Sequence, residues 1–138
     1  MFLRLRDIEN LSTLGSLKSL WLGRNKITKL QGLEGLSSLT LLAMPSNRLT
    51  KITKITGLEG LTSLTLLAMP SNRLTKIEGL EPVPQLTELR LTKIEGLEPV
   101  PQLTELYVSH NGLEKLEGVE HLTLLNTLDI ANNRSNLT

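Results

Sequence analysis

Residues 17–27, LKSLWLGRNKI, decide the fold of this 138-residue chain. They follow the pattern L-x-x-L-x-L-x-x-N-x-I, with the asparagine at a fixed distance from L-x-L. An amphipathic helix would not hold an asparagine at one offset in every copy, so the pattern indicates a repeat and not a helical bundle. The same pattern returns at 39–49, 64–74 and 103–113, at 125–135 with Ser135 in the last position, and weakly from Leu86, where Ile94 replaces the asparagine.

This spacing resembles the leucine-rich repeat of 22 residues. It predicts an α/β solenoid with a parallel β-sheet on its concave face and short helical or 3₁₀ returns on its convex face. One coil cannot bury its own apolar face, so each coil depends on its neighbours for stability. We expect residues 1–138 to form a single array of about six strands, cut within a coil at both ends and lacking capping repeats.

Two internal duplications disturb the period. Residues 38–52 recur unchanged at 63–77, 25 positions later, and residues 74–89 recur at 91–106, 17 positions later. Removing one copy of each restores a regular 22-residue array. The 17-residue coil lacks five residues, so we expect an irregular coil near residues 90–96 to be the weakest point.

Composition excludes several classes of function. Lys+Arg number 15 and Asp+Glu 14, a net charge of +1, which argues against a nucleic-acid partner or an anionic membrane surface. The chain has no cysteine and two histidines, so we expect no disulfide, zinc site or cysteine nucleophile, and no cofactor.

Neither an enzyme nor an exported protein is expected. The pair Ser109 and His110 lacks an acid placed to orient the histidine, and His121 falls on a convex return. No apolar run matches a signal peptide or a membrane span, so we expect an intracellular location.

The repeated asparagines are expected to turn inward and to bond backbone groups that would otherwise lack partners. Losing such a buried partner costs about 1–3 kcal/mol. This predicted ladder comprises Asn25, Asn47, Asn72, Asn111 and Asn133.

Side chains that alternate with the buried leucines are expected to project from the concave face. Trp21 with its apolar neighbours would form an exposed patch, and tryptophan and tyrosine are typical hot-spot residues. The alternative is that Trp21 is an ordinary surface aromatic and that the acidic residues only keep the protein soluble. The predicted partner-binding residues are Trp21, Leu41, Ala43, Leu66, Ala68, Glu88, Glu105, Tyr107 and Asp129.

The segments NKITKL (25–30), SNRLTKI (46–52 and 71–77) and LYVSHNG (106–112) resemble the leucine-rich-repeat regulatory subunit of type 1 serine/threonine protein phosphatase, the regulatory subunit 7 family. The resemblance implies that the concave face binds the phosphatase catalytic subunit, in the nucleus or cytoplasm. Trp21 and Asp129 match the family's binding positions in type, Tyr107 fits the same row, and Arg90 departs from it. Two alternatives stay open: another leucine-rich scaffold or adhesion array of the internalin type, and a truncated, duplicated product without function.

Overall fold

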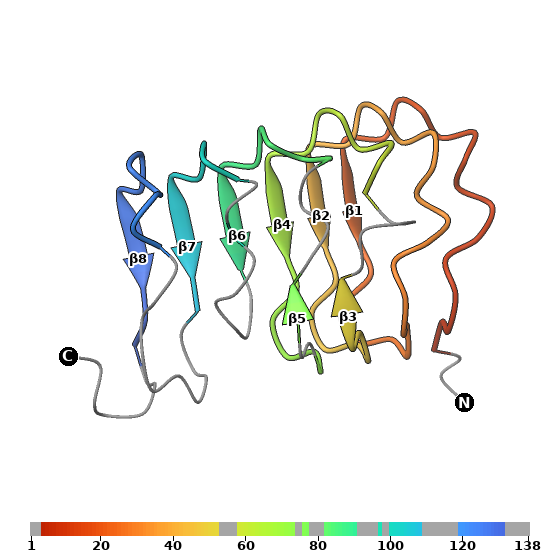
Figure 1. Cartoon of the computed structure of the whole chain (residues 1–138). Coiled ribbons are helices and arrows are strands. Elements are labelled where there is room, and N and C mark those ends of the chain that lie inside the picture. Colours follow the sequence, from red (N-terminus) through yellow and green to blue (C-terminus); the bar gives the residue numbers. More distant parts are fainter. Residues whose placement is uncertain are drawn as a thin grey trace.

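The computed structural model describes residues 4–52, 58–73, 76–77, 82–90, 97, 100–108 and 119–131. Six short strands form one parallel sheet in the order β1-β2-β4-β6-β7-β8 (Figure 1). They are β1 (Ser19–Trp21), β2 (Leu41–Ala43), β4 (Leu66–Ala68), β6 (Glu88–Arg90), β7 (Glu105–Tyr107) and β8 (Thr127–Asp129). A second parallel pair joins β3 (Lys51–Ile52) to β5 (Lys76–Ile77).

The main sheet keeps its register although the coils differ in length. Leu42 pairs with Leu67 across the 25-residue coil, and Leu89 pairs with Leu106 across the 17-residue coil. A one-residue slip would turn every buried leucine outward, so the hydrophobic pattern sets the register and length differences fall outside the strands. We expected an irregular coil near residues 90–96; Arg90 ends β6, and residues 91–96 lie outside the described residues.

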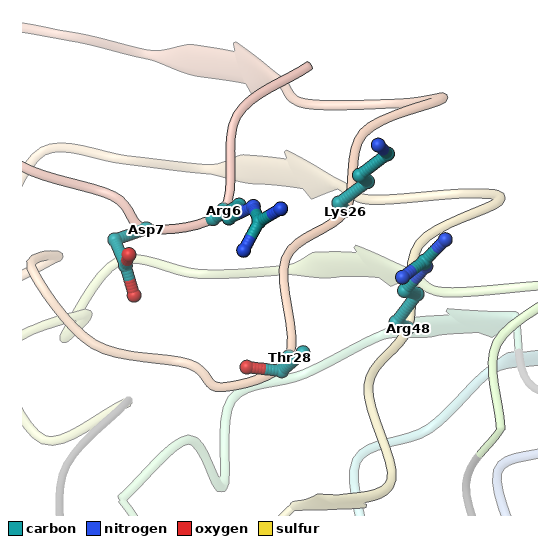
Figure 2. A pocket seen from close by; sticks show the side chains of 5 residues that line it. All are labelled: Arg6, Asp7, Lys26, Thr28 and Arg48. Carbon is teal, nitrogen blue, oxygen red and sulfur yellow. The ribbon is translucent and has the colours of Figure 1, made fainter.

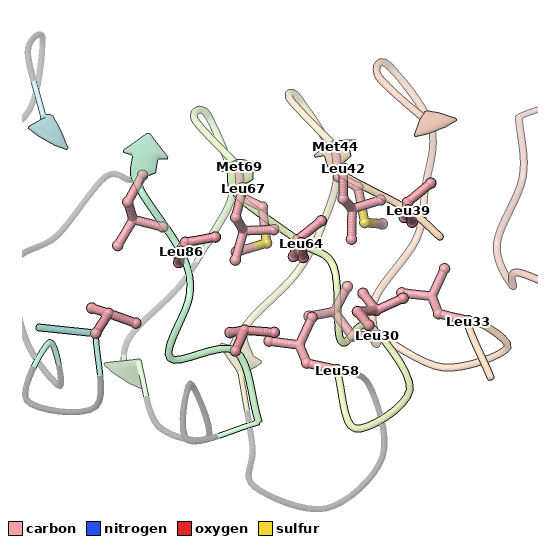
Figure 3. Close-up of a cluster of buried hydrophobic side chains, with 14 of the residues drawn as sticks. Leu30, Leu33, Leu39, Leu42, Met44, Leu58, Leu64, Leu67, Met69 and Leu86 are labelled. Carbon is pink, nitrogen blue, oxygen red and sulfur yellow. The ribbon is translucent and has the colours of Figure 1, made fainter. Parts of the chain in front are cut away.

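The core is a stack of leucines enclosed by the coils (Figure 3). The middle residue of each inner strand is fully buried, as are Met44 and Met69, which follow β2 and β4. Burial decreases at the edge strands, because each has a neighbour on one side only; Leu20 is half-buried and Leu128 is 39% exposed. The core therefore depends on stacking between coils, as in other solenoids.

The convex returns were expected to be short helical or 3₁₀ segments; in the described part of the chain they are runs of single turns with bonds between residues three apart, and this part contains no helix. Backbone bonds join each third residue: Leu36 N donates to Leu33 O at 3.3 Å, and Leu39 N donates to Leu36 O at 3.0 Å. Leucine at every third position suits a turn of three residues, because each turn then buries one leucine. Gly35, with φ +87°, holds the third position of the turn at residues 33–36, where a left-handed φ is typical of a type II β-turn and not of a 3₁₀ turn.

Candidate functional site

The concave face is built from the first and third residue of each strand. In a three-residue strand the middle side chain points to one side of the sheet and the two flanking side chains point to the other. Parallel pairing in register then aligns these side chains in two rows. The first row is Ser19, Leu41, Leu66, Glu88, Glu105 and Thr127, and the second is Trp21, Ala43, Ala68, Arg90, Tyr107 and Asp129.

An apolar half of this face lies over β1, β2 and β4. Trp21 is 70% exposed, and the half-buried Leu41 and Leu66 lie on the next two strands. Ala43 and Ala68 were expected to be exposed, but they are only 2% and 8% exposed. The alanine methyl group is shorter than the neighbouring side chains of Trp21, Leu41 and Leu66, so the two alanines form the floor of the patch.

A charged half lies over β6 and β7. Arg90 Nη2 lies 2.7 Å from Glu88 Oε1, and its guanidinium carbon lies 4.5 Å from the centre of the Tyr107 ring. The Tyr107 hydroxyl donates a 2.6 Å hydrogen bond to Glu105 Oε2. Four side chains from two strands are thereby joined, so Arg90 is a member of the concave surface and one face of the tyrosine ring is covered.

The Glu105 hydrogen bond raises the pKa of Tyr107 above its usual value, because it favours the protonated phenol. Partial burial and the negative charges of Glu105 and Glu88 act in the same direction, while the Arg90 charge opposes them. The tyrosine is therefore a fixed, neutral hydrogen-bond donor on this face at ordinary pH.

Asp129 ends the face on β8, where its carboxylate is half-buried. Its Oδ1 accepts a 3.1 Å hydrogen bond from the backbone N–H of Ala131. One carboxylate oxygen is thus engaged in the local turn, and no side chain of another described residue bonds this carboxylate.

Asparagine side chains bridge successive coils in the loops that follow β1, β2 and β4. Asn47, only 7% exposed, accepts from Ile27 N at 3.1 Å and donates to Leu22 O at 2.8 Å. Asn72 makes the equivalent bonds to Leu49 N and Met44 O one coil later. Asn25 Oδ1 accepts from Leu5 N at 3.0 Å, and the remaining two members of the predicted ladder, Asn111 and Asn133, lie outside the described residues.

A second ladder, of threonines, was missed by the sequence reasoning. Its signal is a threonine that directly follows the first leucine of the repeat in four copies. The hydroxyl groups donate to carbonyl oxygens of the preceding coil at 3.0–3.2 Å: Thr40 to Lys18, Thr65 to Thr40, Thr87 to Thr65 and Thr104 to Thr87.

The described residues offer little for catalysis. His121 lies on a convex return, with Nε2 3.1 Å from Leu97 O, and Ser109 and His110 lie outside the described residues. Within the described ranges no group of three or more His, Cys, Asp or Glu side chains could hold a metal ion. No helix in these ranges is long and apolar enough to span a membrane.

Comparison with known proteins places this geometry among solved repeat structures, while no family model and no curated protein matches the chain. The functional domain of InlJ from Listeria monocytogenes is 35% identical over 85% of this chain and 26% of that chain, with a TM-score of 0.65. An internalin, InlF, from the same organism is 27% identical over 98% of this chain and 44% of that one, with a TM-score of 0.69. The chain is a leucine-rich-repeat solenoid.

Other solved structures support the fold of this solenoid. Internalin C2 from Listeria monocytogenes is 24% identical over 94% of this chain and 62% of that one (TM-score 0.73), and TLR13 in complex with ssRNA13 is 20% identical over 85% and 19% (TM-score 0.71). The solenoid thus spans less than two thirds of each structure. The comparisons favour internalins and lend no support to the phosphatase regulatory subunit in particular. The InlJ domain includes a cysteine ladder, whereas this solenoid has no cysteine and its described ladder positions hold asparagine.

Proposed function

We propose that this solenoid is a non-catalytic protein-binding scaffold that holds its partner against the concave face. The observation that carries the proposal is Trp21, which is 70% exposed beside the half-buried Leu41 and Leu66. An exposed apolar patch on a soluble protein commonly marks an interaction site, and tryptophan is a frequent hot-spot residue. Solenoid repeat proteins commonly use their concave surfaces for binding.

The charged half of the face would orient the bound partner. Together with Asp129 on the adjacent β8, Glu88 and Glu105 outnumber Arg90, so the face over β6, β7 and β8 is acidic on balance. A partner that places an apolar side chain on Trp21 and a cationic side chain over β6 to β8 would be complementary to both halves. Electrostatic complementarity of this kind mainly favours correct orientation and fast association.

Two partner classes follow from different observations. The similarity to internalins supports a scaffold or adhesion array of the internalin type, and this reading is the better supported. The phosphatase reading rests on the sequence motifs and on Trp21, Tyr107 and Asp129, which match the concave row of that family. The type 1 phosphatase catalytic subunit is therefore the one partner that can be tested by name.

Trp21 is the single tryptophan of the chain, which permits a direct test. Protein labelled with 5-fluorotryptophan has one ¹⁹F resonance, and titration with the phosphatase catalytic subunit should shift or broaden it. Trp21→Ala should weaken binding, measured by calorimetry, by about 2 kcal/mol, roughly thirtyfold. Leu14→Ala removes an exposed leucine (45% exposed) away from the sheet and should leave the affinity unchanged.

The outcomes separate the alternatives. Saturable binding that is weakened by Trp21→Ala and not by Leu14→Ala supports the concave face and the phosphatase partner. A protein that melts cooperatively without binding would exclude the phosphatase and leave the internalin-type scaffold. A protein without a cooperative melt would overturn the scaffold proposal in favour of a duplicated product without function.

The expected location in the nucleus or cytoplasm is part of the proposal, and imaging of the tagged protein checks it.

A further inference from the structure

A pocket of about 270 Å³ lies outside the concave face, on the coils around β1 and β2 (Figure 2). Arg6 and Asp7 come from the segment that precedes β1, Lys26 and Thr28 follow β1, and Arg48 follows β2. Three cationic side chains and one carboxylate leave the pocket with a net charge of +2. Each of the five lining residues carries a polar or charged side chain, so the pocket favours a charged ligand over an apolar one.

Coil stacking brings these cations together. Lys26, Arg48 and Arg73 each follow a ladder asparagine and therefore occupy equivalent places in three consecutive coils. Backbone bonds hold this alignment, since Arg48 N donates to Ile27 O at 2.9 Å and Arg73 N to Leu49 O at 2.8 Å. Neighbouring coils in a parallel sheet lie about 4.8 Å apart, so the backbone positions that carry these like charges are neighbours along one edge.

In the described part of the chain, no carboxylate forms an ion pair with the cations of the pocket, Arg6, Lys26 and Arg48. Figure 2 shows the Arg6 guanidinium directed toward the side of Lys26 and Arg48, with the Asp7 carboxylate turned away. Asp7 Oδ1 instead lies 3.5 Å from Gln31 Nε2. Unpaired like charges repel one another, and an anion bound between them would relieve that repulsion.

We propose that this basic pocket binds a phosphate monoester dianion, either on a phosphorylated peptide or free as inorganic phosphate. A phosphate group carries a charge of about −1.5 to −2 at neutral pH, which complements the pocket better than a single carboxylate does. The planar guanidinium groups of Arg6 and Arg48 can each donate two parallel hydrogen bonds to phosphate oxygens. Lys26 adds a charge and Thr28 adds a hydroxyl donor.

A compact phosphate suits the pocket better than a nucleic acid does. Binding of a nucleic-acid strand relies on many phosphate contacts and on aromatic platforms for its bases. The chain carries a net charge of only +1, and its described aromatic residues, Trp21 and Tyr107, lie on the concave sheet and not in the pocket.

The test measures binding of three probes to the full chain. Calorimetry is used for all three, and ³¹P NMR for the two that contain phosphate. The three probes are a Gly-Ser peptide with one phosphoserine, the same peptide without phosphate, and inorganic phosphate. Arg6→Gln combined with Arg48→Gln should weaken phosphate binding by about tenfold or more, because both charge-assisted donor pairs are lost. The control Lys18→Gln removes one charge from an exposed lysine that does not line the pocket, and it should leave affinity unchanged.

The melting temperature provides a second readout, because it distinguishes phosphate binding by Arg6 and Arg48 from a purely structural role of these two residues. Without phosphate, the double variant should melt at the same temperature as the wild type or higher, because like-charge repulsion is reduced. Added phosphate should raise the melting temperature of the wild type and not that of the variant.

Each outcome either tests whether the pocket binds phosphate or shows which phosphate-bearing ligand it prefers. Tighter binding of the phosphopeptide than of free phosphate identifies a peptide ligand, and equal affinities identify the phosphate group alone as the ligand. Absence of saturable phosphate binding, or affinity that is unchanged in the double variant, overturns the proposal. Binding of a single-stranded RNA oligonucleotide without binding of the phosphopeptide overturns it as well.

Discussion

Tyr107 illustrates how neighbouring coils set the properties of one residue. Its hydroxyl is bonded to Glu105 on the same strand, while its ring face is covered by Arg90 from the adjacent strand. These contacts hold the phenol in one orientation. Trp21, which keeps 70% of its surface exposed, is the side chain left free to insert into a partner.

The raised pKa of Tyr107 can be measured directly, because this is the one tyrosine of the chain. Tyrosinate absorbance should titrate with a midpoint above 10.0, the ordinary value. The folded chain holds the proton more tightly than the unfolded chain, so this contribution to stability is complete below pH 10 and is lost as the pH rises through the folded pKa.

Glu105→Gln removes the charge at the carboxylate that raises the pKa most, so it should shift the tyrosinate midpoint downward. Glu120→Gln, at an exposed residue of a return, is the matched control and should leave the midpoint in place. A midpoint that is equal in the wild type and in Glu105→Gln would contradict the hydrogen bond.

At the scale of the element, several of the described coils contain backbone positions with an unusual conformation. The residue before the ladder asparagine has a left-handed φ in three coils, at Arg24 (57°), Ser46 (55°) and Ser71 (57°). The return that follows β1 adds Gly32 (φ 71°) and Gly35 (φ 87°). The loop before the ladder asparagine therefore repeats its left-handed residue from coil to coil, whereas the return does not, since Gly60, at the position equivalent to Gly35, has no left-handed φ.

Gly32 provides the sharpest test of a return. A Cβ at this position would collide with the carbonyl oxygen of Ile8 in the preceding coil, and the left-handed φ adds strain for any L side chain. Gly32→Ala should therefore lower the free energy of unfolding by about 2–3 kcal/mol in urea denaturation. Gly60→Ala is the control, because its Cβ would lie 3.5 Å from the nearest atom, an ordinary contact, and the change should stay within about 1 kcal/mol.

At the scale of the whole molecule, stability depends on position along the array. Every strand of the main sheet pairs with its nearest neighbours only, and β1 and β8 are its edge strands. An inner coil is packed on two sides and an edge coil on one. The same substitution should therefore have different effects along the array.

Leu67 and Leu128 occupy equivalent middle positions of β4 and β8, but their exposed fractions are 0% and 39%. Leu67→Ala should cost about 3 kcal/mol or more, because it opens a cavity between two packed coils. Leu128→Ala should cost about 1 kcal/mol or less. Equal losses in chemical denaturation would show that the chain does not stack as a solenoid.

Much of the fold could be predicted from the repeat spacing. Each coil contacts only its neighbours, so a short motif with one buried leucine per strand specifies strand, register and core. The inward bonds of Asn25, Asn47 and Asn72 follow from the same logic. The threonine ladder was equally visible in the sequence, but a threonine beside a strand carries no unique structural meaning.

The sequence by itself determined the repeat, the sheet and the outward row, since these follow from local periodicity. Only the tertiary structure decided that Ala43 and Ala68 are buried in the floor of the apolar patch. It also decided that Arg90 covers Tyr107, and that unpaired cations gather around one pocket. These features arise between residues of different coils, because the exposure and charge of a side chain depend on what the neighbouring coil places beside it.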